Sequence, residues 1–131
     1  MQSSGALSRL PHMLIWLVRL AAVGCLIALP LLSLLPADQI ERTAAGKNFE
    51  HFTAYFGTAL LLTLGIAAPR RRIYAALALV ALAGVLEIAQ GFTQTRSSEL
   101  AQFLGGSAGV GAGLLAGTLG RAVPRWIFGR L

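Results

Sequence analysis

Four long apolar runs divide the chain, and polar residues gather in the short segments between them. The runs cover about residues 13–35, 49–67, 73–92 and 101–119. Each is close to the ~20 residues that an α-helix needs to cross the ~30 Å hydrocarbon core of a bilayer. The pattern therefore predicts an all-α, polytopic membrane protein, folded as a bundle of four transmembrane helices.

Residues that favour turns separate the runs. They are Pro36–Asp38, Pro69 with the arginines after it, and Thr93–Ser98. Pro30 lies inside the first run, where we expect a kink rather than an end. The first run is long for a secretory signal peptide and lacks a clear cleavage site, so we expect a retained helix. No repeat or composition shift divides the chain, which predicts one membrane domain over residues 1–131.

The composition agrees with this class, because 56% of the residues are hydrophobic and only 12% are charged. The net charge of +6 could indicate a nucleic-acid partner. The basic residues, however, are spread over the ends of the apolar runs, which is typical of membrane proteins, so we expect no nucleic acid. Cys25 is the only cysteine, so no intramolecular disulfide can form and a small apolar role is expected.

The basic residues predict the orientation. With the N-terminus in the cytoplasm, eight arginines lie on the inner side, whereas Arg42, Lys47 and Arg96 lie outside. This bias predicts a chain with both termini in the cytoplasm. All five carboxylates belong to the outer half: Asp38, Glu41, Glu50, Glu87 and Glu99. Acidic residues contribute little to insertion, so their segregation suggests a site on the outer face.

Glu87 is the most informative of these residues because it lies inside an apolar run. It follows Ile73 by fourteen residues, or ~21 Å of helix, which places it beneath the outer surface. A carboxylate there must be protonated or paired with Arg96, Lys47 or His51. An ionisable group at that depth is a functional-site hypothesis by default, although an ion pair that only pins helices is the alternative.

Other polar residues recur at helical spacing near the same end. Lys47, His51 and Tyr55 are spaced i, i+4, i+8, and Gln90 follows Glu87 by one turn. The candidate binding residues are Lys47, Tyr55, Gln90, Arg96, Glu99 and Gln102, and the candidate acid and base are His51 and Glu87. Packing or interfacial roles at a helix end would also explain most of them.

The last run carries a stripe of glycines. Gly105, Gly109, Gly113 and Gly117 recur at every fourth residue. Such a stripe permits close approach to another helix, either within the bundle or in a second copy of the chain.

Several of these segments resemble the VanZ-like family of small bacterial membrane proteins. Gly46–Tyr55 is similar to the family's Asp-Lys-x-x-x-His-x-x-x-Tyr opening, Glu87–Gln90 to its Glu-x-x-Gln, and Arg96–Ala101 to its arginine-containing loop. Gly109 and Gly113 match the Gly-x-x-x-Gly of its final helix. The resemblance covers about residues 46–117.

Three positions depart from the family pattern, since Gly46 replaces Asp, Gln102 replaces Asp and Gly106 replaces Asn. The resemblance implies a protein of the bacterial cytoplasmic membrane that acts at the cell envelope, with a role similar to that of proteins associated with glycopeptide resistance. It does not imply a particular reaction.

Two functions follow from the sequence. In the first, the outer-face site binds or processes an anionic envelope or lipid-linked component. In the second, the chain is a non-enzymatic scaffold or partner subunit that packs through its glycine-rich helix. The sequence has no nucleophile elbow, phosphate loop or zinc motif, so we expect no metal or cofactor and do not favour an enzyme.

Overall fold

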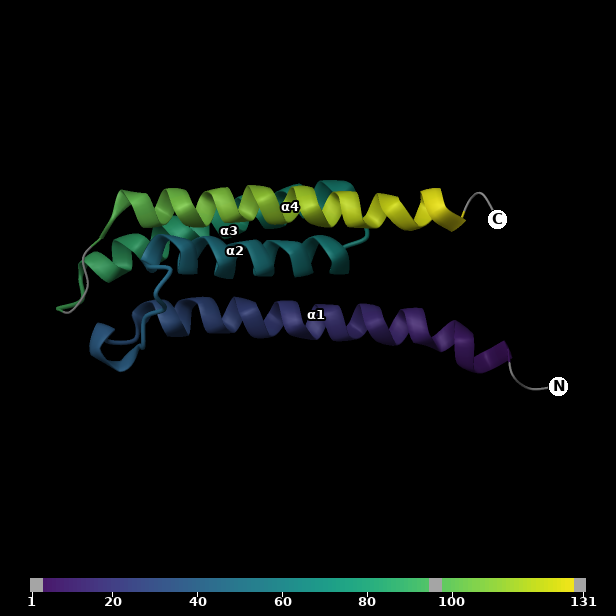
Figure 1. Cartoon of the computed structure of the whole chain (residues 1–131), viewed down its shortest axis with the longest axis horizontal. Coiled ribbons are helices and arrows are strands. Elements are labelled where there is room, and N and C mark those ends of the chain that lie inside the picture. The colour runs from purple at the N-terminus through teal and green to yellow at the C-terminus, as the bar shows by residue number, and fades with distance from the viewer. Residues whose placement is uncertain (1–3, 95–97, 129–131) are drawn as a thin grey trace.

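The computed structural model describes residues 4–94 and 98–128, and in this part of the chain all regular structure is helical. The elements are α1 (Ser4–Leu34), the short 3-10 helix η1 (Ala37–Gln39), α2 (Lys47–Gly65), α3 (Pro69–Gly91) and α4 (Leu100–Phe128). The four α-helices alternate in direction, so the start of α1 and the end of α4 lie at the same end of the bundle (Figure 1). The α1–α2 and α3–α4 connections lie at the opposite end.

Each α-helix begins before the apolar run that predicted it, and α4 also ends after its run, whereas α2 ends at Gly65, two residues before the end of its run. α1 continues through Pro30, and α3 begins at Pro69, so its first turn includes the arginines that the pattern assigned to a connection. Proline is favoured at the first helical position because no N–H is needed there. Hydrophobicity marks only the part of a helix that lies in lipid, whereas arginine also forms helix well and continues it into the interface.

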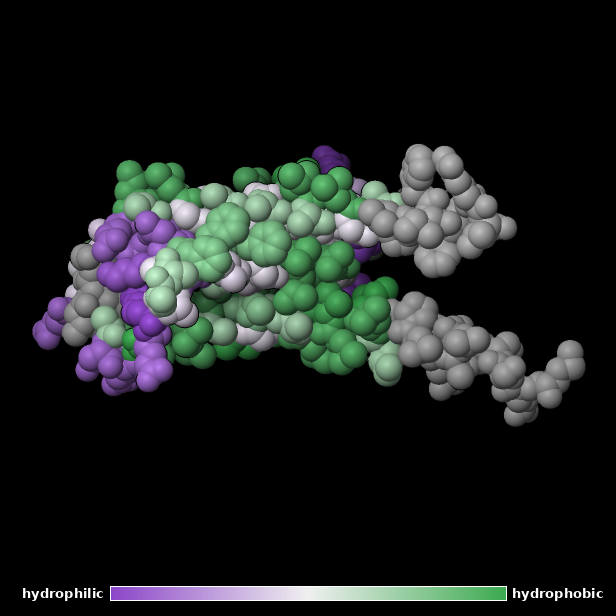
Figure 2. Space-filling model, viewed as in Figure 1, coloured by the Kyte–Doolittle hydropathy of each residue, from purple (hydrophilic) through white to green (hydrophobic). Residues whose placement is uncertain are grey.

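Within the described residues, three helices are long and apolar enough to cross a membrane, namely 12–34 of α1, 69–91 of α3 and 100–122 of α4. Three such helices indicate a multi-pass membrane protein. Large apolar side chains on α1, such as Leu20 and Leu31, are 64% and 63% exposed. Figure 2 shows apolar residues along the bundle and hydrophilic residues gathered at the end opposite the termini. The exposed apolar area therefore suits contact with lipid.

α2 is not one of these three apolar helices, and it lies in the middle of the bundle (Figure 1). It packs against α1, α3 and, most extensively, α4. Thr58 and Thr63 are 1% and 2% exposed, and their hydroxyls donate to the carbonyl oxygens of Ala54 and Ala59 at 2.8 and 2.7 Å. These local bonds satisfy the two hydroxyls inside the bundle.

The glycine stripe of α4 lies against α2. A side chain at Gly109 or Gly113 would meet the carbonyl oxygen of Phe52 or Phe56 in α2. The stripe also includes Gly105 and Gly117, which face Asn48 and Thr63. The missing side chains thus let two helix backbones approach closely. This surface is occupied within the chain, so it is not free to bind a second copy.

Arginines from the other three helices bind carbonyl oxygens at the C-terminal end of α2 and in the connection that follows it. Arg19 Nε donates to the carbonyl oxygen of Gly65 at 3.0 Å, and Arg121 Nη1 donates to that of Leu64 at 2.5 Å. Arg72 Nε donates at 2.8 Å to the carbonyl oxygen of Ile66 in the connection after α2, and its Nη2 donates to that of Ala67 at 2.5 Å. The last carbonyls of a helix lack intrahelical donors and carry partial negative charge, so Arg19 and Arg121 both satisfy and neutralise those of α2.

The two ends of the bundle therefore differ in charge. We call the end with these arginines the arginine end. The acidic end is the opposite one, which carries Asp38, Glu41, Glu50, Glu87 and Glu99.

Candidate functional site

The sequence-predicted site residues lie at the acidic end but do not share one cavity. They are Lys47, His51 and Tyr55 at the start of α2, Glu87 and Gln90 near the end of α3, and Glu99 and Gln102 at the start of α4. Arg96, the preferred partner of Glu87, lies outside the described residues.

Glu87 is buried, with 6% exposure, and caps α4. Its Oε1 accepts a hydrogen bond from the backbone N–H of Glu99, the residue just before α4. The first N–H groups of a helix have no intrahelical acceptor, and the helix dipole favours a negative charge beside them. The sequence predicted that Glu87 is protonated or paired with Arg96, Lys47 or His51; the structure provides a backbone donor, and Arg96 lies outside the described residues.

Two buried amides lie near Glu87. Gln90 and Gln102 are 1% and 3% exposed. Gln90 Nε2 donates to the carbonyl oxygen of Ser33 in α1 at 3.0 Å, and the hydroxyl of Thr93 donates to the Gln90 carbonyl at 2.8 Å. An unpaired amide in apolar surroundings is costly. The hydrogen bond of Gln90 therefore connects α3 to α1, which is a structural role.

Lys47 forms an ion pair across the bundle end. Its Nζ is 3.5 Å from Glu99 Oε1, and the two side chains are 48% and 40% exposed. Exposed pairs of this kind contribute little to stability and are screened by salt. Neither Lys47 nor Glu99 lines either of the clefts described below.

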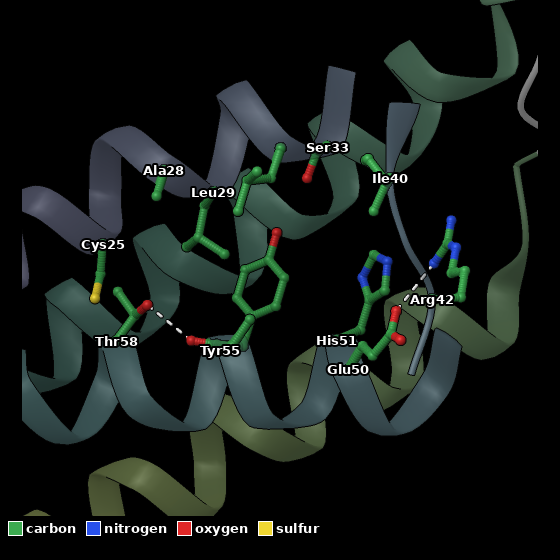
Figure 3. A pocket seen from close by; sticks show the side chains of 12 residues that line it. Cys25, Ala28, Leu29, Ser33, Ile40, Arg42, Glu50, His51, Tyr55 and Thr58 are labelled. Atoms are coloured by element: carbon green, nitrogen blue, oxygen red, sulfur yellow. Dashed lines mark hydrogen bonds and ion pairs between the residues drawn. The ribbon is translucent and has the colours of Figure 1, made fainter. Parts of the chain in front are cut away.

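A cleft of about 330 Å³ opens between α1 and α2 at the acidic end (Figure 3). His51 and Tyr55 are the sequence-predicted residues that line it. Figure 3 shows both rings between α1 and α2, with His51 nearer the connection that carries Arg42. The two rings stack with their centroids 6.4 Å apart. Cys25, Ala28 and Leu29 of α1 and Thr58 of α2 form the part of the wall farther from the connection.

Glu50 holds the α1–α2 connection beside this cleft. Its Oε2 lies 3.2 Å from Nη1 of Arg42, while its Oε1 accepts from the backbone N–H and the hydroxyl of Thr43 at 2.6 and 2.8 Å. Arg42 makes no further hydrogen bond or ion pair with the described residues. The structure thus adds Arg42 and Thr43 to the candidate site. No pattern in the sequence links them to Glu50, because they reach it from an irregular loop.

The cleft has polar side chains at the end near the α1–α2 connection and mainly apolar ones farther from it, which suits an amphiphilic ligand. Arg42 can bind a phosphate or carboxylate through parallel N–H donors, and the ring nitrogens of His51 can take part in hydrogen bonds. Glu87 does not line the cleft, so His51 and Glu87 do not face a common ligand there. No three His, Cys, Asp or Glu side chains among the described residues are grouped to hold a metal ion.

Comparison with known proteins finds no family model, no curated protein and no solved structure that matches the chain. The fold and the site therefore define its class, which is a multi-pass helical membrane protein with an amphipathic cleft beside its acidic end.

Proposed function

We propose that this chain is a VanZ-like membrane protein of the bacterial cell envelope, and that the cleft between α1 and α2 binds an anionic, lipid-linked envelope component. One observation carries the proposal. Arg42 and His51 line the part of the cleft nearest the α1–α2 connection, while Cys25 and Leu29 line the part farther from it along the helices. A phosphate head followed by a hydrocarbon chain matches that order of surfaces.

The orientation is part of the proposal. The arginine end carries most of the basic residues, which supports placing that end in the cytoplasm. The acidic end and its cleft then face the outside, where envelope precursors are used. The VanZ-like motif residues between 46 and 117 belong mainly to this end and support the same placement.

The net charge of the acidic end does not attract an anion by itself. Among the described residues it carries five carboxylates against two cations, Arg42 and Lys47, a difference of −3. Binding must therefore rest on directed hydrogen bonds from Arg42 and His51, which gain strength where the cleft excludes water. Affinity should depend on individual side chains rather than on total charge.

A binding role is favoured over catalysis because the two acid–base candidates are separated. Glu87 is committed to the backbone of α4, and His51 alone lines the cleft. A scaffold that docks a partner through its glycine stripe is not favoured, since α2 of the same chain occupies that stripe.

The test is the binding of a polyprenyl phosphate to the purified full chain in zwitterionic detergent, followed by native mass spectrometry. Arg42→Gln removes a charged donor from the cleft and should weaken binding about tenfold. Lys47→Gln is the matched control, because Lys47 is a cation at the same end that does not line the cleft. We expect that control to bind as the wild type does.

Three outcomes would contradict the proposal. The wild type could bind the phosphate no better than the uncharged polyprenol of the same length, or both variants could lose affinity equally. The third outcome is measured in cells, in a strain from which the gene for this chain has been deleted. The proposal is contradicted if Arg42→Gln restores glycopeptide resistance to that strain as fully as the wild type does at equal abundance.

A further inference from the structure

We infer that the arginine end holds a second site, which binds the phosphate group of an anionic phospholipid. A cleft of about 410 Å³ lies there between α1 and the α2–α3 connection. Arg19 and Arg71 line it together with apolar residues that include Val23 and Leu61. It lies at the opposite end of the bundle from the cleft of the proposed function, and neither site depends on the other.

The positive charge beside this cleft has no counter-charge from the described part of the chain. The arginines at this end whose side chains the structure describes are Arg19, Arg70, Arg71, Arg72 and Arg121. All five carboxylates lie at the acidic end. Glu87 follows Arg71 by sixteen residues of the same helix, or ~24 Å. Exposed charges separated by more than about 10 Å are largely screened, so the carboxylates of the described residues do not neutralise the arginines that line this cleft.

Arg19 is held in a position suited to an anion. Its Nε donates to the Gly65 carbonyl at 3.0 Å, and its guanidinium carbon lies 5.2 Å from the ring centre of Trp16. Its terminal nitrogens make no hydrogen bond with the described residues. Arg71 makes no hydrogen bond or ion pair with them at all. Two guanidinium groups with unused donors therefore line one cleft, and guanidinium binds phosphate through two parallel N–H bonds.

The rest of the wall favours a lipid over free phosphate. Val23 is 51% exposed and lies one helical turn after Arg19, toward the middle of α1, and Leu61 and Leu62 of α2 line the same cleft. An acyl chain could continue along these residues below a phosphate held by the arginines. Trp16 beside Arg19 is 61% exposed, as expected of a tryptophan at the headgroup level. Basic pockets between membrane helices are known headgroup sites.

The experiment compares two neighbouring arginines. Arg71→Gln removes a guanidinium that lines the cleft, and Arg70→Gln removes one that does not. Neither arginine bonds to a described residue, so both variants should fold as the wild type does. Affinity for short-chain phosphatidylglycerol is measured by native mass spectrometry on the full chain in zwitterionic detergent, with phosphatidylcholine and inorganic phosphate as comparison ligands.

We expect the wild type to bind phosphatidylglycerol in preference to phosphatidylcholine. Arg71→Gln should weaken that binding about tenfold, and Arg70→Gln by less than about threefold. Equal losses in the two variants would mean that total charge, not a site, binds the lipid. Equal affinity for the two lipids would also overturn the inference. If inorganic phosphate displaces phosphatidylglycerol when the two are present at equal concentration, the lipid assignment is overturned and free phosphate is the ligand.

Discussion

Replacing Gly113 by alanine tests the close approach of α2 and α4. The new methyl carbon would lie 2.8 Å from Cβ of Ala59 and 3.0 Å from the backbone nitrogen of Leu60, and it would also meet the carbonyl oxygen of Phe56. Carbon atoms in ordinary contact are about 3.5–4.0 Å apart. Since two of these three neighbours are backbone atoms, α4 would have to move away from α2 by roughly 1 Å.

Overpacking of this kind costs about 1–3 kcal/mol, whereas alanine gains up to about 1 kcal/mol over glycine in helix propensity. We therefore expect Gly113→Ala to lower the free energy of unfolding by about 1–2 kcal/mol. Gly111 provides the control, because it lies on the same helix and a methyl carbon added there would have no neighbour within 4 Å. Gly111→Ala should leave stability unchanged or raise it slightly.

The assay is thermal unfolding of the purified full chain in one detergent, followed by circular dichroism. The wild type and both variants are compared at equal protein concentration, so that any contribution of self-association is the same for all three. If Gly113→Ala proves as stable as Gly111→Ala, the backbones of α2 and α4 are not in contact at Gly113 and the reasoning is refuted.

Three further changes test other contacts. In the same scan, Glu87→Gln should lower the free energy of unfolding by about 1–2 kcal/mol, because it weakens the cap of α4. The exposed Glu41→Gln is the control and should change that free energy by less than about 0.5 kcal/mol. Equal effects of the two changes would show that the charge of Glu87 does not cap the helix. Arg19→Gln should cost about 1 kcal/mol relative to Arg70→Gln, which breaks no described bond, and no difference would exclude a stabilising role for the bond to α2. Bound polyprenyl phosphate should slow alkylation of Cys25, the only cysteine, by a membrane-permeant maleimide, and an unchanged rate would place the ligand outside the cleft.

The apolar pattern predicted an all-helical chain with four long helices, and the structure confirms that much. Alternation of direction then brings the carboxylates to one end, because each of them lies near a connection at that end. The spacing of Lys47, His51 and Tyr55 predicted one shared face. Positions eight residues apart are nevertheless turned by ~80° around a helix, so Lys47 lies outside the cleft that Tyr55 lines.

The partners of the charged groups were harder to predict. Sequence spacing shows which side chains share a helix face, but it does not show how each helix is rotated in the bundle. It also contains no signal for backbone donors and acceptors. Glu87 binds a backbone N–H, and Arg19 binds a backbone carbonyl, so neither contact could be found by matching charged residues with one another. The cleft depends on the rotation of α1 against α2 and was missed for the same reason.

The central place of α2 has a consequence for the order in which the protein is made. α2 ends at Gly65 and α4 begins at Leu100, so about 35 residues must be synthesised before the main partner of α2 starts to emerge. During that interval the surface that the glycines of α4 will cover has no neighbour, and α2 lacks the long apolar stretch that the other three helices have. Its final position in the membrane is therefore reached late, when the last helix is inserted beside it, and a ribosome that stops before α4 leaves a chain whose central helix lacks its principal contact.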